Sequence, residues 1–109
     1  MLCRVILSGL MLFSLMLEPH SQTLGIGRES CAYWQSSSNR QTEGAIWILG
    51  YWSGFDTMEQ TIRSVGEDLG EQGRIAAVKK TCDAKPSISL SEATADTYWE
   101  TLKRDPKRP

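Results

Sequence analysis

The residues that could carry catalysis are few in this chain of 109 residues. Its only histidine, His20, lies just after an apolar N-terminal run that we expect to be removed, so the mature protein should contain none. Without histidine, neither a Ser-His-Asp nor a Cys-His arrangement can form, and the usual histidine metal sites are excluded. Cys31 and Cys82 have neither the spacing of zinc ligands nor a C-x-x-C redox motif.

Three carboxylates, Glu67, Asp68 and Glu71, gather in a glycine-rich stretch over 66–73. Neighbouring carboxylates can act as a hydrolytic pair or hold a cation. Here the alternating Asp and Asn of a calcium loop are missing, and the glycines lack the strand and the lysine of a phosphate-binding loop. We therefore predict a solvated acidic loop, with no catalytic residue, no metal site and no cofactor, in a protein that is not an enzyme.

The first residues predict export. Arg4 precedes the apolar run over 5–17, which is too short to span a bilayer comfortably as a helix. We predict that residues 1–23 form a signal peptide, with cleavage between 21 and 25, after Ser21 or after Gly25. An uncleaved anchor is the alternative. Residues 24–109 are then a single helical domain with a loose basic C-terminal tail.

Removal of the signal peptide also removes Cys3 and leaves an even pair of cysteines in a small exported domain. Such pairs are oxidised in secreted proteins. We predict a disulfide between Cys31 and Cys82, with two free buried thiols as the alternative. The loop that it closes is long, and the chain-entropy model assigns such a cross-link about 4 kcal/mol, comparable to the whole stability of a small domain.

Charge argues against two classes of partner. The 12 basic and 13 acidic residues nearly cancel and are interspersed. Nothing therefore favours binding to nucleic acid or to an anionic membrane surface.

Apolar spacing predicts an all-α protein, a small bundle of about four helices stapled by one disulfide. Ser30 is expected to cap a short first helix, and a polar linker is expected over 36–42. The apolar segment 43–55 is expected to be a buried helix, with a pair of strands as the alternative. A third helix is expected over 74–82, after the glycine-rich loop.

The last helix has the clearest start signal in the chain. Ser89 is placed as N-cap and Glu92 at N3, which is the pattern of a capping box. Helical spacing then predicts one buried stripe, formed by Leu90, Ala93, Thr94, Thr97, Tyr98 and Leu102.

The central helix carries a motif of two glycines and two aromatic residues: Gly50, Tyr51, Gly54 and Phe55. Each glycine costs about 1 kcal/mol of helix propensity, so we expect a compensating close approach by another helix across the face that the two share. We predict a packed core here. A ligand or partner groove is the main alternative, and membrane contact is the weakest one.

Three stretches, "SCAYW", "WILGYWSGF" and "KKTCDAKPSISLSEAT", together give the chain a family resemblance. Their layout resembles the small periplasmic HdeA-type acid-stress chaperones, and it is also similar to the Rap and Tai immunity proteins of secretion systems. The resemblance implies a periplasmic helical protein in which Cys31 and Cys82 form the family disulfide. It also implies that Gly50, Tyr51, Gly54 and Phe55 match the central helix motif, and it brings no catalytic residue.

The two groups imply different functions and different protein partners. An acid chaperone, often a homodimer, loosens when its carboxylates are protonated and then binds unfolded clients. Four acids near the predicted apolar faces could carry that response: Glu43, Asp56, Asp96 and Glu100. An immunity protein needs a rigid surface that fits one toxin effector, and the predicted partner surface is then Glu67, Asp68 and Glu71. A third possibility is a secreted interaction protein with neither role.

Overall fold

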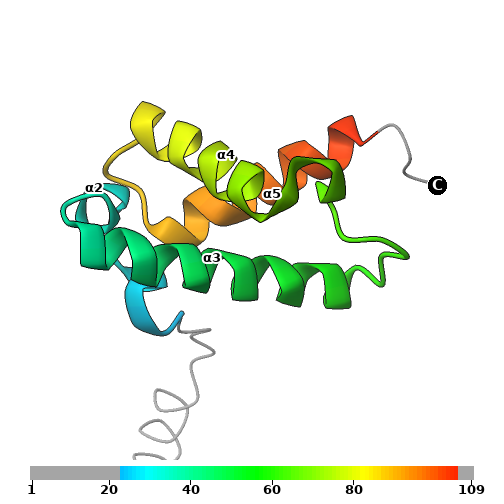
Figure 1. The fold of residues 1–109 in the computed structure, drawn as a ribbon, viewed down its shortest axis with the longest axis horizontal. Helices are drawn as coiled ribbons and strands as arrows, with labels where there is room; N and C mark the ends of the chain where they lie inside the picture. Colours follow the sequence, from blue (N-terminus) through cyan, green and yellow to red (C-terminus); the bar gives the residue numbers. More distant parts are fainter. Residues whose placement is uncertain (1–22, 106–109) are drawn as a thin grey trace, which may run out of the picture.

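The computed structural model describes residues 23–105. This part of the chain forms two short 3₁₀ helices and four α-helices (Figure 1). In chain order they are η1 Gly25–Arg28, α2 Cys31–Trp34, α3 Ser38–Met58, η2 Glu67–Leu69, α4 Gly70–Ala84 and α5 Leu90–Arg104. The predicted signal peptide falls outside the described residues except for its last position, and so does the end of the predicted tail over 106–109. The prediction of an all-α bundle stapled by one disulfide is confirmed.

The long helix α3 runs along one side of the molecule, and α4 and α5 lie on the other side (Figure 1). Helix α5 contacts both α3 and α4. The short α2 lies at one end, near the turn that joins α4 to α5, and the loop that follows α3 lies at the opposite end. We call the first of these the disulfide end, residues 29–34 and 82–90. The second is the loop end, residues 56–69 and 98–105.

One hydrophobic core joins η1 and the four α-helices. Helix α3 buries Ile48 and Trp52, and α4 buries Val78 and Cys82. All six residues of the stripe predicted on the last helix are buried: Leu90, Ala93, Thr94, Thr97, Tyr98 and Leu102. The polar members of that stripe remain satisfied, because Thr94 and Thr97 donate to carbonyl oxygens one turn earlier in the same helix.

Serine side chains begin three of the helices. Ser30 Oγ accepts the Tyr33 N–H at 3.1 Å and begins α2, as predicted. Ser89 Oγ accepts the Glu92 N–H at 3.1 Å and begins α5, again as predicted. Ser37 Oγ accepts the Arg40 N–H at 3.2 Å and begins α3. Each bond satisfies one of the backbone donors that a helix start leaves unpaired.

The start at Ser37 overturns the predicted linker over 36–42. Residues 36–42 show no periodic spacing of apolar residues, and for this reason we predicted a linker. In the structure, residues 38–42 form the solvent-exposed start of α3. Tertiary contacts hold these turns in helical form. Trp34 folds back onto them, and its Nε1–H donates to the carbonyl oxygen of Gln41 at 3.1 Å.

The predicted loop over 66–73 is wrong in its second half. Gly66 and Gly70 have φ of 72° and 69°, a region that glycine enters at no steric cost, and between them lies the single turn of η2. Helix α4 then begins at Gly70 and includes Gly73, so it is a turn longer than the predicted 74–82 at its start. The disulfide and the packing of Val78 and Cys82 fix this helix in the core, and they outweigh the low propensity of its glycines.

Candidate functional site

The predicted disulfide is present between Cys31 and Cys82. Both residues are fully buried, and their Cα atoms are 5.2 Å apart. The bond joins α2 to α4, and two backbone hydrogen bonds reinforce it. The Cys31 N–H donates to the Ile88 carbonyl, and the Leu90 N–H donates to the Glu29 carbonyl, each at 2.8 Å. The disulfide end is therefore closed by a covalent bond and by main-chain pairing.

The prediction that another helix packs closely against Gly50 and Gly54 is wrong. Both glycines are exposed, and a Cβ atom added at either one would meet nothing within 4 Å. Helix α3 turns the side of Ile48 and Trp52 toward α5, which leaves the two glycines on the solvent side.

Two other glycines make the close approaches in this fold. A Cβ atom at Gly44 would overlap the indole ring of Trp34, and one at Gly27 would overlap the ring of Trp47. Trp47 also donates its Nε1–H to the Leu24 carbonyl oxygen at 3.1 Å. The expectation that a glycine marks a close approach therefore holds at Gly27 and Gly44. At both positions the indole ring of a neighbouring helix packs directly against the glycine backbone.

The aromatic half of the central motif packs on both α3 and α5. The ring of Tyr51 stacks on Trp47 with centroids 4.5 Å apart, and it meets the edge of Phe55 at 4.9 Å. Phe55 in turn stacks on Tyr98 of α5 at 4.9 Å. Such pairs contribute beyond their area of contact. Tyr51 and Phe55 therefore belong to a cluster of rings that leads from the middle of α3 to the loop end.

One carboxylate at the loop end connects three parts of the chain. Asp56 Oδ1 accepts hydrogen bonds from the Tyr98 hydroxyl of α5 at 2.8 Å and from the Val65 N–H at 3.1 Å. Its Oδ2 accepts from Ser64 Oγ at 2.6 Å. Asp56 itself directly follows Phe55, the last ring of the cluster on α3. This single side chain thus holds the end of the α3–η2 loop against α3 and α5.

Side chains from α3 and α4 complete the same network. Arg74 of α4 donates from Nη2 to Ser64 Oγ at 2.9 Å and from Nε to the Val65 carbonyl at 3.2 Å. The Trp52 Nε1–H donates to that same carbonyl at 2.8 Å. Val65 is buried, and both of its main-chain polar groups are thereby satisfied.

The phenol at the centre of this network is held in its neutral form. Burial raises the pKa of Tyr98 well above its ordinary value, and the hydrogen bond to Asp56 and the negative charges of Asp56 and Glu59 raise it further. The Tyr98 hydroxyl is therefore a hydrogen-bond donor throughout the neutral and acidic range.

The other three acids that we expected near apolar faces lie on the surface. Glu43 and Asp96 are exposed, and so is Glu100, whose Oε1 is 3.5 Å from Lys103 Nζ and whose Oε2 is 4.0 Å from Arg104 Nη2. Exposed pairs of this kind contribute little to stability. Of the four acids, Asp56 is the one whose hydrogen bonds join α3 to the loop and to α5.

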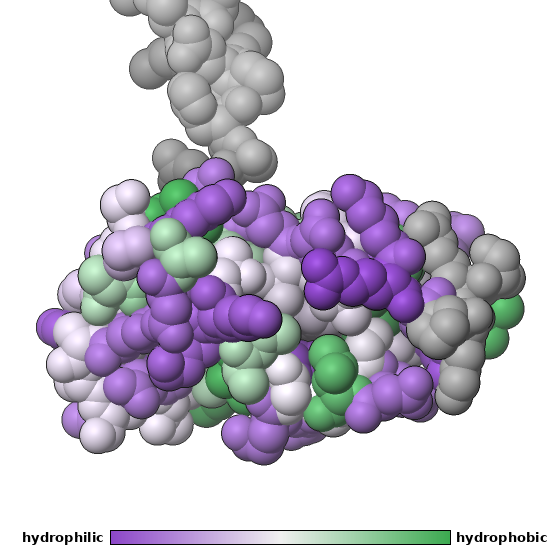
Figure 2. Space-filling view, turned by 90° about the horizontal axis from the view of Figure 1, so that it is seen from above, coloured by the Kyte–Doolittle hydropathy of each residue, from purple (hydrophilic) through white to green (hydrophobic). Residues whose placement is uncertain are grey.

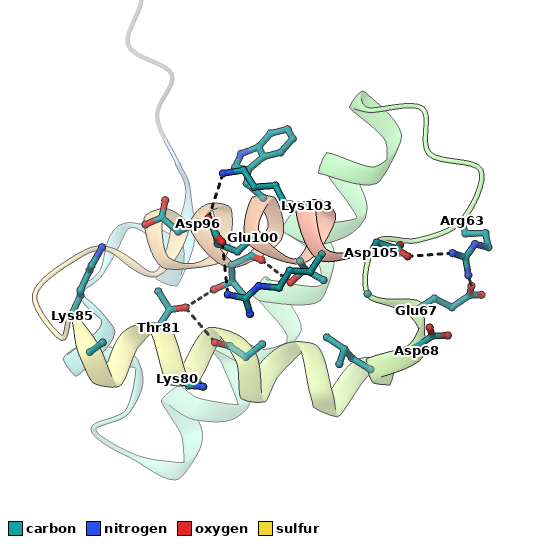
Figure 3. Close-up of a pocket in the computed structure, with 18 residues that line it drawn as sticks. Arg63, Glu67, Asp68, Lys80, Thr81, Lys85, Asp96, Glu100, Lys103 and Asp105 are labelled. Atoms are coloured by element: carbon teal, nitrogen blue, oxygen red, sulfur yellow. Dashed lines mark hydrogen bonds and ion pairs between the residues drawn. The ribbon is translucent and has the colours of Figure 1, made fainter. Parts of the chain in front are cut away.

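The predicted acidic surface is divided between two grooves. Glu67 and Asp68 lie on the edge of a groove between α4 and α5, whereas Glu71 lies on the edge of a second groove, between α3 and α4. All three side chains are exposed. Glu67 forms an ion pair with Arg63 at 3.1 Å, and Arg63 also reaches Asp105 at 3.6 Å (Figure 3).

The α4–α5 groove has a volume of about 950 Å³. On its floor, Thr81 and Thr97 share a hydrogen bond of 2.8 Å between their hydroxyls (Figure 3). Charged side chains of both signs line its length, among them Lys80, Lys85, Asp96 and Glu100. Figure 2 looks onto this side of the molecule and shows a mainly hydrophilic face with hydrophobic residues scattered over it. The groove holds no nucleophile beside a base.

No group of three or more His, Cys, Asp and Glu side chains within 23–105 is placed to hold a metal ion. No helix in the same range combines the length and the apolar character needed to cross a bilayer.

Comparison with known proteins adds no assignment: no family model, no curated protein and no solved structure matches this chain.

Proposed function

We propose that this protein is a periplasmic, non-enzymatic acid-stress chaperone of HdeA type, which binds unfolded client proteins after acid has opened its loop end. The observation that carries the proposal is the Asp56 carboxylate. It accepts three hydrogen bonds that close the loop end, from Ser64, Val65 and Tyr98. Export through a signal peptide and the buried disulfide fit an oxidising compartment.

Protonation of Asp56 would weaken this closure. A protonated carboxyl group offers fewer acceptor sites than a carboxylate, and its own O–H requires an acceptor. The charged or titratable groups that face Asp56 directly or through Ser64 are Tyr98 of α5 and Arg74 of α4, with Glu59 nearby on the loop side. Tyr98 and Arg74 are donors, so neither can accept the new proton while it keeps its present bond.

Opening of the loop end would uncover apolar surface that the folded protein hides. Trp52, Val65 and Tyr98 are buried there, and the ring of Tyr98 packs on the rings of Trp52 and Phe55. Unfolded clients bind such surface through the hydrophobic effect. The disulfide would meanwhile keep α2 and α4 together, so the opened chain would stay compact enough to close again at neutral pH.

The test follows the aggregation of an acid-unfolded client at about pH 3, where ordinary carboxylates are protonated. Oxidised mature protein should suppress the aggregation and bind a hydrophobic dye, and it should do neither at neutral pH. Asp56→Asn should bind the dye already at neutral pH, whereas Asp96→Asn, the same change at an exposed position, should behave like the natural protein. Client aggregation that is unaffected by the protein would contradict the proposal.

A dedicated immunity protein against a secretion-system effector is the second candidate. The observation that favours it is the firmly held α3–η2 loop with its acidic surroundings at Glu67 and Asp68. This function needs a folded surface at neutral pH and no acid response. A protein that remains folded at about pH 3 and leaves the client to precipitate would favour it.

A further inference from the structure

We infer that the α3–η2 loop, residues 59–66, is a docking element for a folded protein partner that offers an apolar pocket with a basic rim. The inference goes beyond the proposed acid function, because it concerns the closed protein at neutral pH. It depends on three observations: an apolar loop tip, a firmly held loop base and a negative local charge.

The loop tip presents apolar side chains to solvent. Ile62 is 91% exposed, and Met58, at the last turn of α3, is 77% exposed. A single exposed apolar residue is common on protein surfaces and indicates nothing by itself. Here the two lie at the same end of the molecule, on and beside a loop that projects from the bundle (Figure 1).

The base of the loop is held from both sides. At its start, the Glu59 N–H donates to the Phe55 carbonyl at 2.8 Å, and the Thr61 N–H donates to the Asp56 carbonyl at 3.2 Å. At its end, Ser64 and Val65 are bound to the Asp56 carboxylate. A loop that is already ordered loses little conformational entropy when it binds, so its contacts contribute more fully to affinity. An exposed side chain on such a loop is suited to fill a pocket in a partner.

Charge around the loop indicates the character of that pocket. The loop end, residues 56–69 and 98–105, contains six carboxylates and three cations, a net charge of −3, and Arg74 of α4, which donates to Ser64 and Val65, reduces it to −2. Arg63 is already engaged by Glu67 and Asp105. A complementary partner therefore carries basic groups around an apolar pocket, and long-range attraction would speed its association. The same negative charge disfavours nucleic acid and anionic lipid as partners.

The experiment uses the full chain, exported from its own cell, with a photo-crosslinking amino acid in place of Ile62. The matched control carries the same amino acid in place of Ile46, which is 69% exposed on α3. We expect one discrete protein to be crosslinked from position 62 and not from position 46. Absence of a crosslink, or the same products from both positions, would overturn the inference.

The captured protein is then purified, and its affinity for the uncrosslinked chain is measured at neutral pH. Ile62→Ser should weaken binding about tenfold or more, as the loss of a central apolar contact does, and Ile46→Ser should leave it unchanged. Affinity should fall as salt rises, because the rim contacts are ionic. Equal affinity of the two serine variants would refute the docking role.

The two proposals can fail independently. Ile62→Ser removes no contact within the fold, so its melting temperature and its protection of clients at about pH 3 should equal those of the natural protein. If Ile62→Ser lost partner binding and kept client protection, the loop would serve a function of its own.

Discussion

The two ends of this molecule are closed by different kinds of bond. At the disulfide end, a covalent link between Cys31 and Cys82 joins α2 to α4, and main-chain pairs reinforce it. At the loop end, the side chain of Asp56 gathers three hydrogen bonds from the loop and from α5. The first closure is covalent and can be opened by reduction, whereas the second consists of hydrogen bonds to one carboxylate, and we propose that acid opens it.

Under the proposed function, this difference would let one small domain combine a stable end with an end that opens in acid. A chain of this size buries too little surface for large stability, so a cross-link is needed somewhere. The disulfide itself carries no ionisable group, and the ion pair between Lys79 and Asp83 at that end is exposed. The polar network lies where the aromatic cluster ends, so its opening would expose rings. The following four predictions test this comparison.

The largest effect is expected from removal of the cross-link. Cys31→Ser together with Cys82→Ser should lower the free energy of unfolding by about 4 kcal/mol, because the 51-residue separation leaves a long loop unconstrained in the unfolded chain. Urea unfolding at neutral pH would measure it. A reductant added to the natural protein should reproduce the loss, and an unchanged midpoint in both cases would refute the role given to the disulfide end.

Asp56→Asn should lower the free energy of unfolding by about 2 kcal/mol, since an amide cannot accept the three bonds that the carboxylate accepts. The loss should be local. Amide hydrogen exchange should quicken at 61–66 and remain slow around Cys31. Uniformly faster exchange along the chain would show that the two ends are not independent.

Two glycine-to-alanine substitutions in α3 should change the stability of the protein in opposite directions. Gly44→Ala should cost about 2 kcal/mol of stability, because the new methyl group would overlap the ring of Trp34. Gly50→Ala should stabilise by about 1 kcal/mol, because it improves helix propensity in open space. Thermal unfolding of the two variants side by side would test this. A destabilising Gly50→Ala would instead indicate that the exposed face of α3 is covered in solution.

The smallest effect concerns alkaline pH. Burial and the hydrogen bond to Asp56 raise the pKa of Tyr98 in the folded protein above its ordinary value of 10.0, so the neutral form stabilises the fold fully below that pH. Above it, the unfolded chain loses this proton while the folded protein keeps it, so stability falls as the pH rises. Tyr98→Phe should cost about 1 kcal/mol at neutral pH and should flatten the decline above pH 10.

Much of the fold could be predicted because its signals are local. The N-cap positions Ser30 and Ser89 and the buried stripe of α5 all follow from residues within a few positions of one another. The disulfide was predicted from the even number of cysteines left in a chain that we expected to be exported. The N-cap role of Ser37 was not predicted, because no apolar residue follows it closely. The first turns of its helix are held instead by the hydrogen bond from Trp34 to the Gln41 carbonyl.

The candidate site was predicted less well, because its contacts join distant residues. Asp56 was one of four acids named from their neighbourhood, and the hydrogen bond that distinguishes it comes from Tyr98, 42 positions away. The acidic residues Glu67 and Glu71 are close in sequence, but the turn into α4 places them on different grooves.

Local sequence therefore decides where α2 and α5 begin and which side of α5 is buried, because caps and periodicity act over a single turn or two. Packing decides the rest. Whether a glycine meets a ring or open water, as at Gly44 and Gly50, depends on which face of α3 meets its neighbours. Whether a carboxylate such as Asp56 closes the loop end depends on a loop and a second helix that arrive only when the chain has folded.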